Sequence, residues 1–133
     1  MSDHPVVAYK ILTESQMAEL LTSGSFAGAP IDIADGYIHL STAQQVDETV
    51  ARHFAGNHDL HIAAVNLTLL GDTVCWELSR GGQLFPHVYA ALPLSVVIAQ
   101  GRLDHTADGA IILPDARASR AKVGPGFSRK AMR

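Results

Sequence analysis

The stretch that decides the fold runs Asp35-Gly36-Tyr37-Ile38-His39-Leu40-Ser41-Thr42-Ala43-Gln44-Gln45. Its opening Asp-Gly is a turn signal, and the apolar and aromatic residues that follow favour a strand. A hydroxyl residue three places before a glutamine is then typical of a helix start. We therefore expect a strand at residues 37–40 and a helix from about residue 43 to residue 54.

The flanking segments indicate the same mixture of helix and strand. Residues 6–12 are β-branched and aromatic enough for a buried strand, and Thr13-Glu14-Ser15-Gln16 has the form of another helix start. Residues 24–36 are dominated by Gly, Pro, Asp and Ala, which predicts a loop. Further strands are expected at 60–67, 73–78 and 94–99, with a hairpin around 107–109. Strand, helix, strand, helix and then mainly strands predict an α+β domain rather than a wound parallel sheet.

Length and charge indicate one domain with a basic tail. The chain has 133 residues, of which 47% are hydrophobic, enough for a single core. We expect one α+β domain at residues 1–114 and a basic, flexible tail at residues 115–133. Residues 1–115 hold 4 basic and 13 acidic side chains, a formal charge of -9, whereas residues 116–133 carry +6. An acidic body repels polyanions, so nucleic-acid binding by the folded domain is not expected.

Several classes of protein are disfavoured by what the sequence lacks. No stretch approaches the roughly 18 apolar residues of a membrane-spanning helix, and the N-terminus does not have the form of a signal peptide, so we expect a cytoplasmic protein with no membrane partner. Cys75 is the single cysteine, which excludes an intrachain disulfide and a cysteine-based zinc cage. His53, His58 and His61 lack a known ligand spacing, so no metal site is expected.

One strand of the chain gathers polar side chains. Because successive side chains of a strand point to opposite faces, Tyr37, His39 and Ser41 should share one face and Ile38 and Leu40 the other. The helix start that follows offers free backbone amides, which suit a phosphate or a carboxylate. The pattern predicts an anion or nucleotide pocket. The alternative is that Ser41 and Thr42 only cap the helix while His39 hydrogen-bonds a neighbouring strand.

A second segment carries another histidine and another tyrosine. It runs Gly81-Gly82-Gln83-Leu84-Phe85-Pro86-His87-Val88-Tyr89. Its glycines and proline favour a loop that presents His87 to a ligand. The alternative is that the apolar residues pack at an edge and His87 is simply exposed.

Taken together, several short motifs resemble one family. They are Tyr9-Lys10-Ile11-Leu12, Gly24-Ser25-Phe26-Ala27-Gly28, residues 35–42, Gln45, Phe54-Ala55-Gly56, Trp76-Glu77 and Phe85-Pro86-His87-Val88-Tyr89. Over about residues 6–103 they look like the bacterial family known as domain of unknown function 952. The resemblance implies an ADP-ribosyltransferase-like fold, in which a split mixed or antiparallel β-sheet with a few flanking helices clamps NAD in a cleft.

The resemblance also implies roles for single residues. Ile38-His39-Leu40-Ser41 is similar to a strand of NAD-dependent RNA 2'-phosphotransferases, so His39 would hold or polarise the NAD ribose. Glu77 would steady the positive charge that develops on the ribose as nicotinamide leaves, although it could equally be a surface carboxylate. The residues expected around the nucleotide are Tyr9, Lys10, Tyr37, Ser41, Thr42, His87 and Tyr89.

Two functions therefore follow from the sequence. The first is an ADP-ribosyltransferase-like domain that binds NAD or a related nucleotide and transfers or hydrolyses ADP-ribose. The second is a non-catalytic module that binds a small anionic metabolite or a protein partner through the same cleft. Convergence of Glu77 and His39 on one pocket would favour the first, and a salt-bridged Glu77 far from His39 the second.

Overall fold

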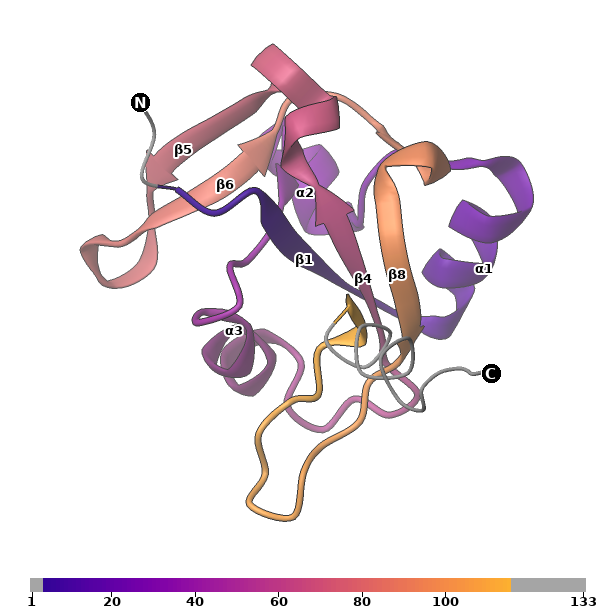
Figure 1. Ribbon diagram of the computed structural model, residues 1–133, viewed down its shortest axis with the longest axis vertical. Helices are drawn as coiled ribbons and strands as arrows, with labels where there is room; N and C mark the ends of the chain where they lie inside the picture. The colour runs from indigo at the N-terminus through magenta and orange to yellow at the C-terminus, as the bar shows by residue number, and fades with distance from the viewer. Residues whose placement is uncertain (1–3, 116–133) are drawn as a thin grey trace, which may run out of the picture.

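The computed structural model describes residues 4–115, which form an α+β domain with antiparallel sheets (Figure 1). One three-stranded sheet is ordered β1 (Val7–Leu12), β4 (His61–Asn66), β8 (Val97–Arg102). The other is ordered β3 (Ile38–His39), β6 (Leu84–Val88), β5 (Val74–Leu78), and a short pair joins β2 (Ser25–Phe26) to β7 (Leu92–Pro93). The helices are α1 (Glu14–Ser23), α2 (Pro30–Asp35) and α3 (Val46–His53), with 3₁₀ segments η1 (Leu67–Thr73), η2 (Arg80–Gly82) and η3 (Leu94–Val96). The predicted α+β class is confirmed.

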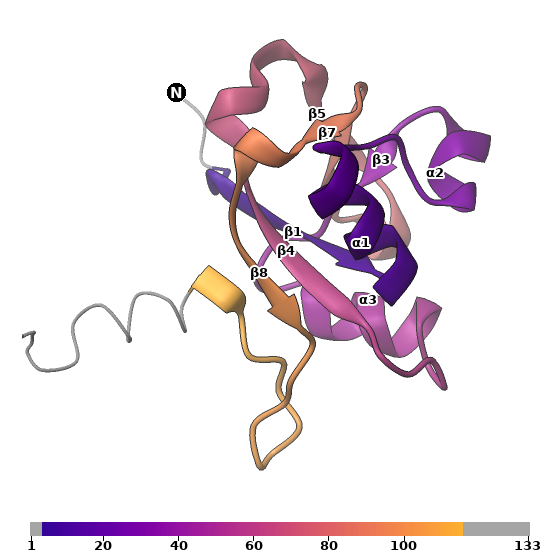
Figure 2. The same cartoon turned by 90° about the vertical axis from the view of Figure 1, so that its right-hand side faces the viewer.

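The strands β1 and β4 of the first sheet are mostly buried on both faces, whereas the edge strand β8 is exposed at alternate residues. The central strand β4 has a fully buried middle, Ile62 to Val65, as the run of small and β-branched residues predicted. Ala63 and Val65 pack with Met17 and Leu20 of α1. Ile62 packs on the opposite face, where α3 and the segment after β8 cover the sheet (Figure 2). Apolar contacts therefore hold both faces of this sheet.

The second sheet has one apolar face and one polar face. Ile38, Leu40 and Val88 join the main core, as the alternation along residues 37–41 predicted. His39 and His87 are directly opposite each other in the register of β3 and β6. The polar face of this sheet is therefore built around a cross-strand histidine pair.

A single bridge links the two sheets. Tyr9 N–H donates to Ser41 O at 2.7 Å, and Ser41 N–H donates to Tyr9 O at 2.9 Å. The strands therefore follow one another as β8-β4-β1 and β3-β6-β5, with the sheet split at β1 and β3. The split leaves room between the two halves, and this is where the candidate site lies.

The predicted start of α1 is confirmed in detail. Thr13 Oγ1 accepts from Gln16 N–H at 3.2 Å, and Gln16 Oε1 accepts from Thr13 N–H at 2.9 Å, which together form a capping box. The helix ends at Gly24, whose φ of 84° lies in the left-handed region that favours glycine. The hairpin expected around 107–109 is also present, with a bridge between His105 and Ile111.

Four expectations about segment boundaries are wrong. Residues 24–36 are not a loop, because they contain β2 and α2. Residues 84–88 are not a loop either but β6, the central strand of the second sheet. The helix expected from residue 43 begins at Val46, after a turn in which Gln45 Oε1 accepts from Thr42 N–H at 3.0 Å. The last strand spans 97–102 instead of 94–99, because residues 94–96 form η3.

The predicted tail beyond Asp115 lies outside the described residues. Within residues 4–115, no helix combines the length and apolarity that crossing a membrane would need.

Candidate functional site

A cavity of about 620 Å³ lies at the split between the two sheets. Five of the residues expected around a nucleotide or at its ribose line it: Tyr9, Lys10, His39, Ser41 and His87. Phe54 and Phe85 add aromatic walls, and α1 contributes its first turn. A hollow of this size with few polar groups is typical of small-molecule sites. The structure thus brings the two sequence segments onto one cavity.

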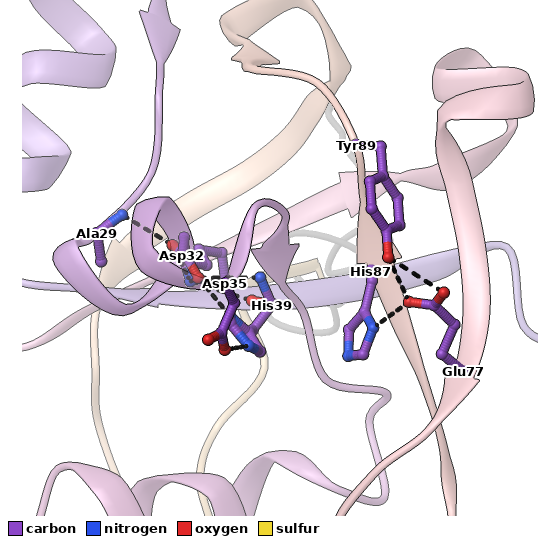
Figure 3. A network of polar contacts seen from close by, with 8 residues as sticks. Ala29, Asp32, Asp35, His39, Glu77, His87 and Tyr89 are labelled. Atoms are coloured by element: carbon purple, nitrogen blue, oxygen red, sulfur yellow. Dashed lines mark hydrogen bonds and ion pairs between the residues drawn. The ribbon is translucent and has the colours of Figure 1, made fainter.

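A buried carboxylate holds the first histidine. Asp32, 1% exposed, accepts from Lys10 Nζ at 2.9 Å, from Ala29 N–H at 2.8 Å and from His39 N–H at 3.0 Å. Its Oδ1 also lies 2.6 Å from His39 Nδ1 (Figure 3). Burial by itself raises the pKa of the Asp32 carboxyl, but the hydrogen bond from the His39 ring and the Lys10 charge hold that pKa well below its usual range. Asp32 is therefore an anion that fixes α2, β1 and β3 together.

The other nitrogen of His39 also meets a carboxylate. His39 Nε2 lies 2.9 Å from Asp35 Oδ2, at the end of α2. Carboxylates therefore meet both ring nitrogens of His39, which fixes the orientation of the ring at the cavity.

The second histidine is held differently. His87 Nδ1 lies 2.6 Å from Glu77 Oε1, and Tyr89 Oη donates to the same carboxylate at 2.9 Å and 3.1 Å (Figure 3). The hydrogen bond from His87, followed by that from Tyr89, lowers the pKa of Glu77. The same bond to Glu77 raises the pKa of Tyr89 to about 12. Glu77 thus stays ionised and positions two ring systems.

Tyr37 lies between the two histidine systems. Its ring centroid is 4.1 Å from that of His87, 4.7 Å from that of His39 and 5.2 Å from that of Tyr89. Burial, followed by the charges of Asp35 and Glu77, raises the pKa of Tyr37. The aromatic cluster therefore joins both carboxylate–histidine pairs into one face.

The hydroxyls of Ser41 and Tyr9, two residues that line the cavity, are each hydrogen-bonded to another part of the chain. Ser41 Oγ lies 2.8 Å from Thr49 Oγ1, so its hydroxyl bonds α3 while its backbone joins the two sheets. Tyr9 Oη donates to Asp115 Oδ1 at 2.8 Å. Burial, followed by that hydrogen bond, raises the pKa of Tyr9 above its ordinary range. Asp115, where the predicted tail begins, is thus fixed beside the cavity.

Not every expected residue reaches the cavity. Thr42 is buried and uses its N–H on Gln45. Glu77 does not line the cavity but touches His87, which does. Tyr37 and Tyr89 line a second, smaller hollow of about 310 Å³ beside the first. Lys10 lines the cavity, but its ammonium is already paired with Asp32.

Sequence reasoning missed Asp32 and Asp35. The signal was Pro30-Ile31-Asp32, since proline at the first position of a helix and an acidic residue at the third are typical of a helix start. Within residues 4–115, no three His, Cys, Asp or Glu side chains are arranged to hold a metal ion.

Comparison with known proteins gives the family. The sequence profile of the family described as "Protein of unknown function (DUF952)" matches residues 11–100. The chain belongs to this family. No curated protein shows significant sequence similarity to this DUF952 chain.

Solved structures of a related protein share the fold. The crystal structure of protein CC0527 from Caulobacter crescentus is 42% identical to this DUF952 chain with a TM-score of 0.74, covering 84% of this chain and 98% of that one. A double-mutant crystal structure of CC0527 is 41% identical, with a TM-score of 0.74 and the same coverage. Its solution NMR structure is 41% identical with a TM-score of 0.70, covering 84% of this chain and 97% of that one.

Proposed function

We propose that this chain binds NAD or a related nucleotide in the cavity between its two sheets and transfers or hydrolyses ADP-ribose there, as an ADP-ribosyltransferase-like domain. The observation that carries the proposal is the convergence of Tyr9, Lys10, His39, Ser41 and His87 on one cavity of about 620 Å³. The resemblance implied a contact with the nucleotide or its ribose for each of these residues. A cavity at the split of a β-sheet is also what the resemblance implied.

The lining suits the nucleoside part of the ligand. Aromatic side chains at Phe54 and Phe85 offer faces for a base or a nicotinamide ring, and the Ser41 hydroxyl and His39 offer polar contacts to a ribose. The carboxylate of Asp35 lines the cavity. It suits the positive charge that develops on ribose as its bond to nicotinamide breaks.

The lining suits the pyrophosphate less well. Lys10 is the lysine that lines the cavity, and Asp32 neutralises it at 2.9 Å. The Lys10 ammonium is therefore not free to pair with a phosphate, and the Thr42 and Gln45 amides before α3 are already hydrogen-bonded within the protein. Binding should depend only weakly on salt, because few free cationic side chains take part.

Thermal unfolding with ligands tests the proposal. A ligand that binds only the folded state stabilises it by about 2.7 kcal/mol at a hundred times its Kd. NAD and ADP-ribose at millimolar concentration should raise the melting temperature, inorganic phosphate should not, and Ser41→Ala should weaken the shift. His58→Ala, which removes an exposed histidine outside the cavity lining, is the matched control. Absence of any nucleotide shift in the wild type would overturn the proposal.

A non-catalytic binding module is the second candidate, and two observations favour it. Asp32 and Asp35 meet both ring nitrogens of His39, which leaves neither nitrogen unpaired for proton transfer. Glu77 is paired with His87 and does not share the cavity lining with His39. The two functions differ in whether nicotinamide is released from NAD. Stabilisation by ADP-ribose without release of nicotinamide from NAD would select the binding module.

A further inference from the structure

Within residues 4–115, the Nε2 atom of His87 has no hydrogen-bond partner, whereas both ring nitrogens of His39 meet carboxylates. Among residues 4–115, Glu77 is the hydrogen-bond partner of the His87 ring, at 2.6 Å from Nδ1. The ring is 3% exposed and yet lines the cavity. Since a carboxylate only accepts, Nδ1 carries the proton of the neutral ring and Nε2 carries the lone pair. A sheltered nitrogen base thus borders the proposed substrate cavity.

The sheet fixes the direction of that base. His87 is in the central strand β6, where Cys75 of β5 and His39 of β3 flank it in register. Tyr37 stacks on its ring at a centroid distance of 4.1 Å and an interplanar angle of 23°. A ring held by a carboxylate and a stacked neighbour keeps one tautomer and one orientation, which proton transfer requires.

Glu77 is itself held in place despite its exposure. The side chain is 41% exposed, but Tyr89 Oη donates to both of its oxygens, at 2.9 Å and 3.1 Å. A surface carboxylate without such partners would rotate freely. Tyr89, Glu77 and His87 therefore form a relay of three side chains that ends at the cavity.

The geometry points to His87 Nε2 as the general base of this site, with Glu77 as its positioning residue. This inference rests on the proposed function and names the nucleophile class, an O–H group of water or of an acceptor alcohol. Nε2 takes the proton of the O–H group as its oxygen bonds to C1' of the ribose. The bond from C1' to the nicotinamide nitrogen breaks, its electron pair stays on that nitrogen, and nicotinamide leaves as a neutral molecule. The proton passes from His87 to water, which balances the reaction.

Glu77 thereby has a different role from the one expected. The resemblance placed it at the ribose, where it would stabilise positive charge. In the structure it lies behind His87 and outside the cavity lining. It acts on the reaction through the imidazole.

Kinetics of three variants test the assignment. His87→Gln removes the base and should lower kcat for nicotinamide release from NAD by about 10²–10⁴, the usual share of general-base catalysis. Glu77→Gln should lower kcat to a smaller extent and leave the Kd for ADP-ribose unchanged, and His58→Gln should leave both unchanged. Adding methanol tells the two nucleophiles apart, because an alcohol that competes with water gives methyl ADP-ribose. A His87→Gln variant that retains wild-type kcat overturns the inference.

A spectroscopic measurement keeps the test valid if a variant does not fold. The ¹⁵N shifts of the His87 ring in the wild type should report a protonated Nδ1 and an unprotonated Nε2 at neutral pH, and Glu77→Gln should mix the two tautomers. A wild-type ring protonated on Nε2 overturns the inference. So does a wild type that binds ADP-ribose but releases no nicotinamide, an outcome in which nucleotide binding still stands. If ADP-ribose does not bind at all, the proposed function itself fails.

Discussion

The two sheets of this domain differ in the polarity of the side chains on their faces. The sheet β1-β4-β8 packs between α1 on one side and α3 on the other through mainly apolar side chains, with Lys10 of β1 as a buried charge. The sheet β3-β6-β5 gives one face to the core and carries histidines, tyrosines and carboxylates on the other. Apolar burial gains free energy without choosing precise partners, whereas buried polar groups are tolerated only when every one is paired. The first sheet should therefore tolerate change better than the second.

The largest expected effect comes from breaking the polar contacts by which Asp32 joins β1 of the first sheet to β3 of the second. Asp32→Asn removes the anion opposite Lys10, which is 5% exposed and would remain a buried charge without compensation. Loss of one partner of a buried pair costs about 3–5 kcal/mol of the free energy of unfolding. Urea unfolding at neutral pH measures this loss.

The matched control removes both charges. Lys10→Met combined with Asp32→Asn should recover part of the loss, because the orphaned ammonium is then gone. A double variant as unstable as the single one would show that Asp32 acts through His39 and Ala29 instead.

Acid should act on the same carboxylate. The folded-state pKa of Asp32 lies below its unfolded-state value of about 3.9, so its contribution is complete above about pH 4. That contribution is lost as the pH falls from there toward the folded-state pKa. The free energy of unfolding should decline from about pH 4 downwards, and the decline should be shallower in Asp32→Asn. Equal slopes in both proteins would contradict the assignment.

A conservative change in the first sheet should have a smaller effect. Ile62 is 1% exposed at the centre of β4, and Ile62→Val removes one methylene for about 0.5–1.5 kcal/mol. Ligand-induced shifts in melting temperature should stay as in the wild type, because Ile62 does not line the cavity. If Ile62→Val abolished the ligand-induced shift in melting temperature, the two sheets would be coupled more tightly than the single Tyr9–Ser41 backbone bridge suggests.

The smallest effect is expected for an exposed ion pair, which can be compared with the buried pair of Lys10 and Asp32. Arg102 and Asp59 are 2.8 Å apart, as close as Lys10 and Asp32, but their side chains are 59% and 58% exposed. Solvent screens such a pair, so Arg102→Ala should lower the melting temperature far less than Asp32→Asn does. Thermal melting at low and high salt would measure it, and a cost as large as that of Asp32→Asn would show that burial is not what separates the two pairs.

The errors of the sequence-based predictions have physical causes. Proline usually disrupts strands, and this predicts a loop at Phe85-Pro86-His87. In the structure, however, Pro86 pairs with Trp76 inside the second sheet. Helix α2 was missed because it is a single short segment whose Ile31 and Ile33 are both exposed, so it has no apolar stripe to reveal it. Both errors concern elements that tertiary contacts hold in place.

The sequence by itself determined the α+β class, the capped start of α1, the buried middle of β4 and the shared face of Tyr37 and His39. These features depend on residues close together in the chain, where periodicity and capping chemistry act. Only the tertiary structure decided that Asp32 holds Lys10 and His39, that His39 is opposite His87, and that Glu77 holds His87. Those contacts depend on strand register and on how α2 packs, which are set by the whole core.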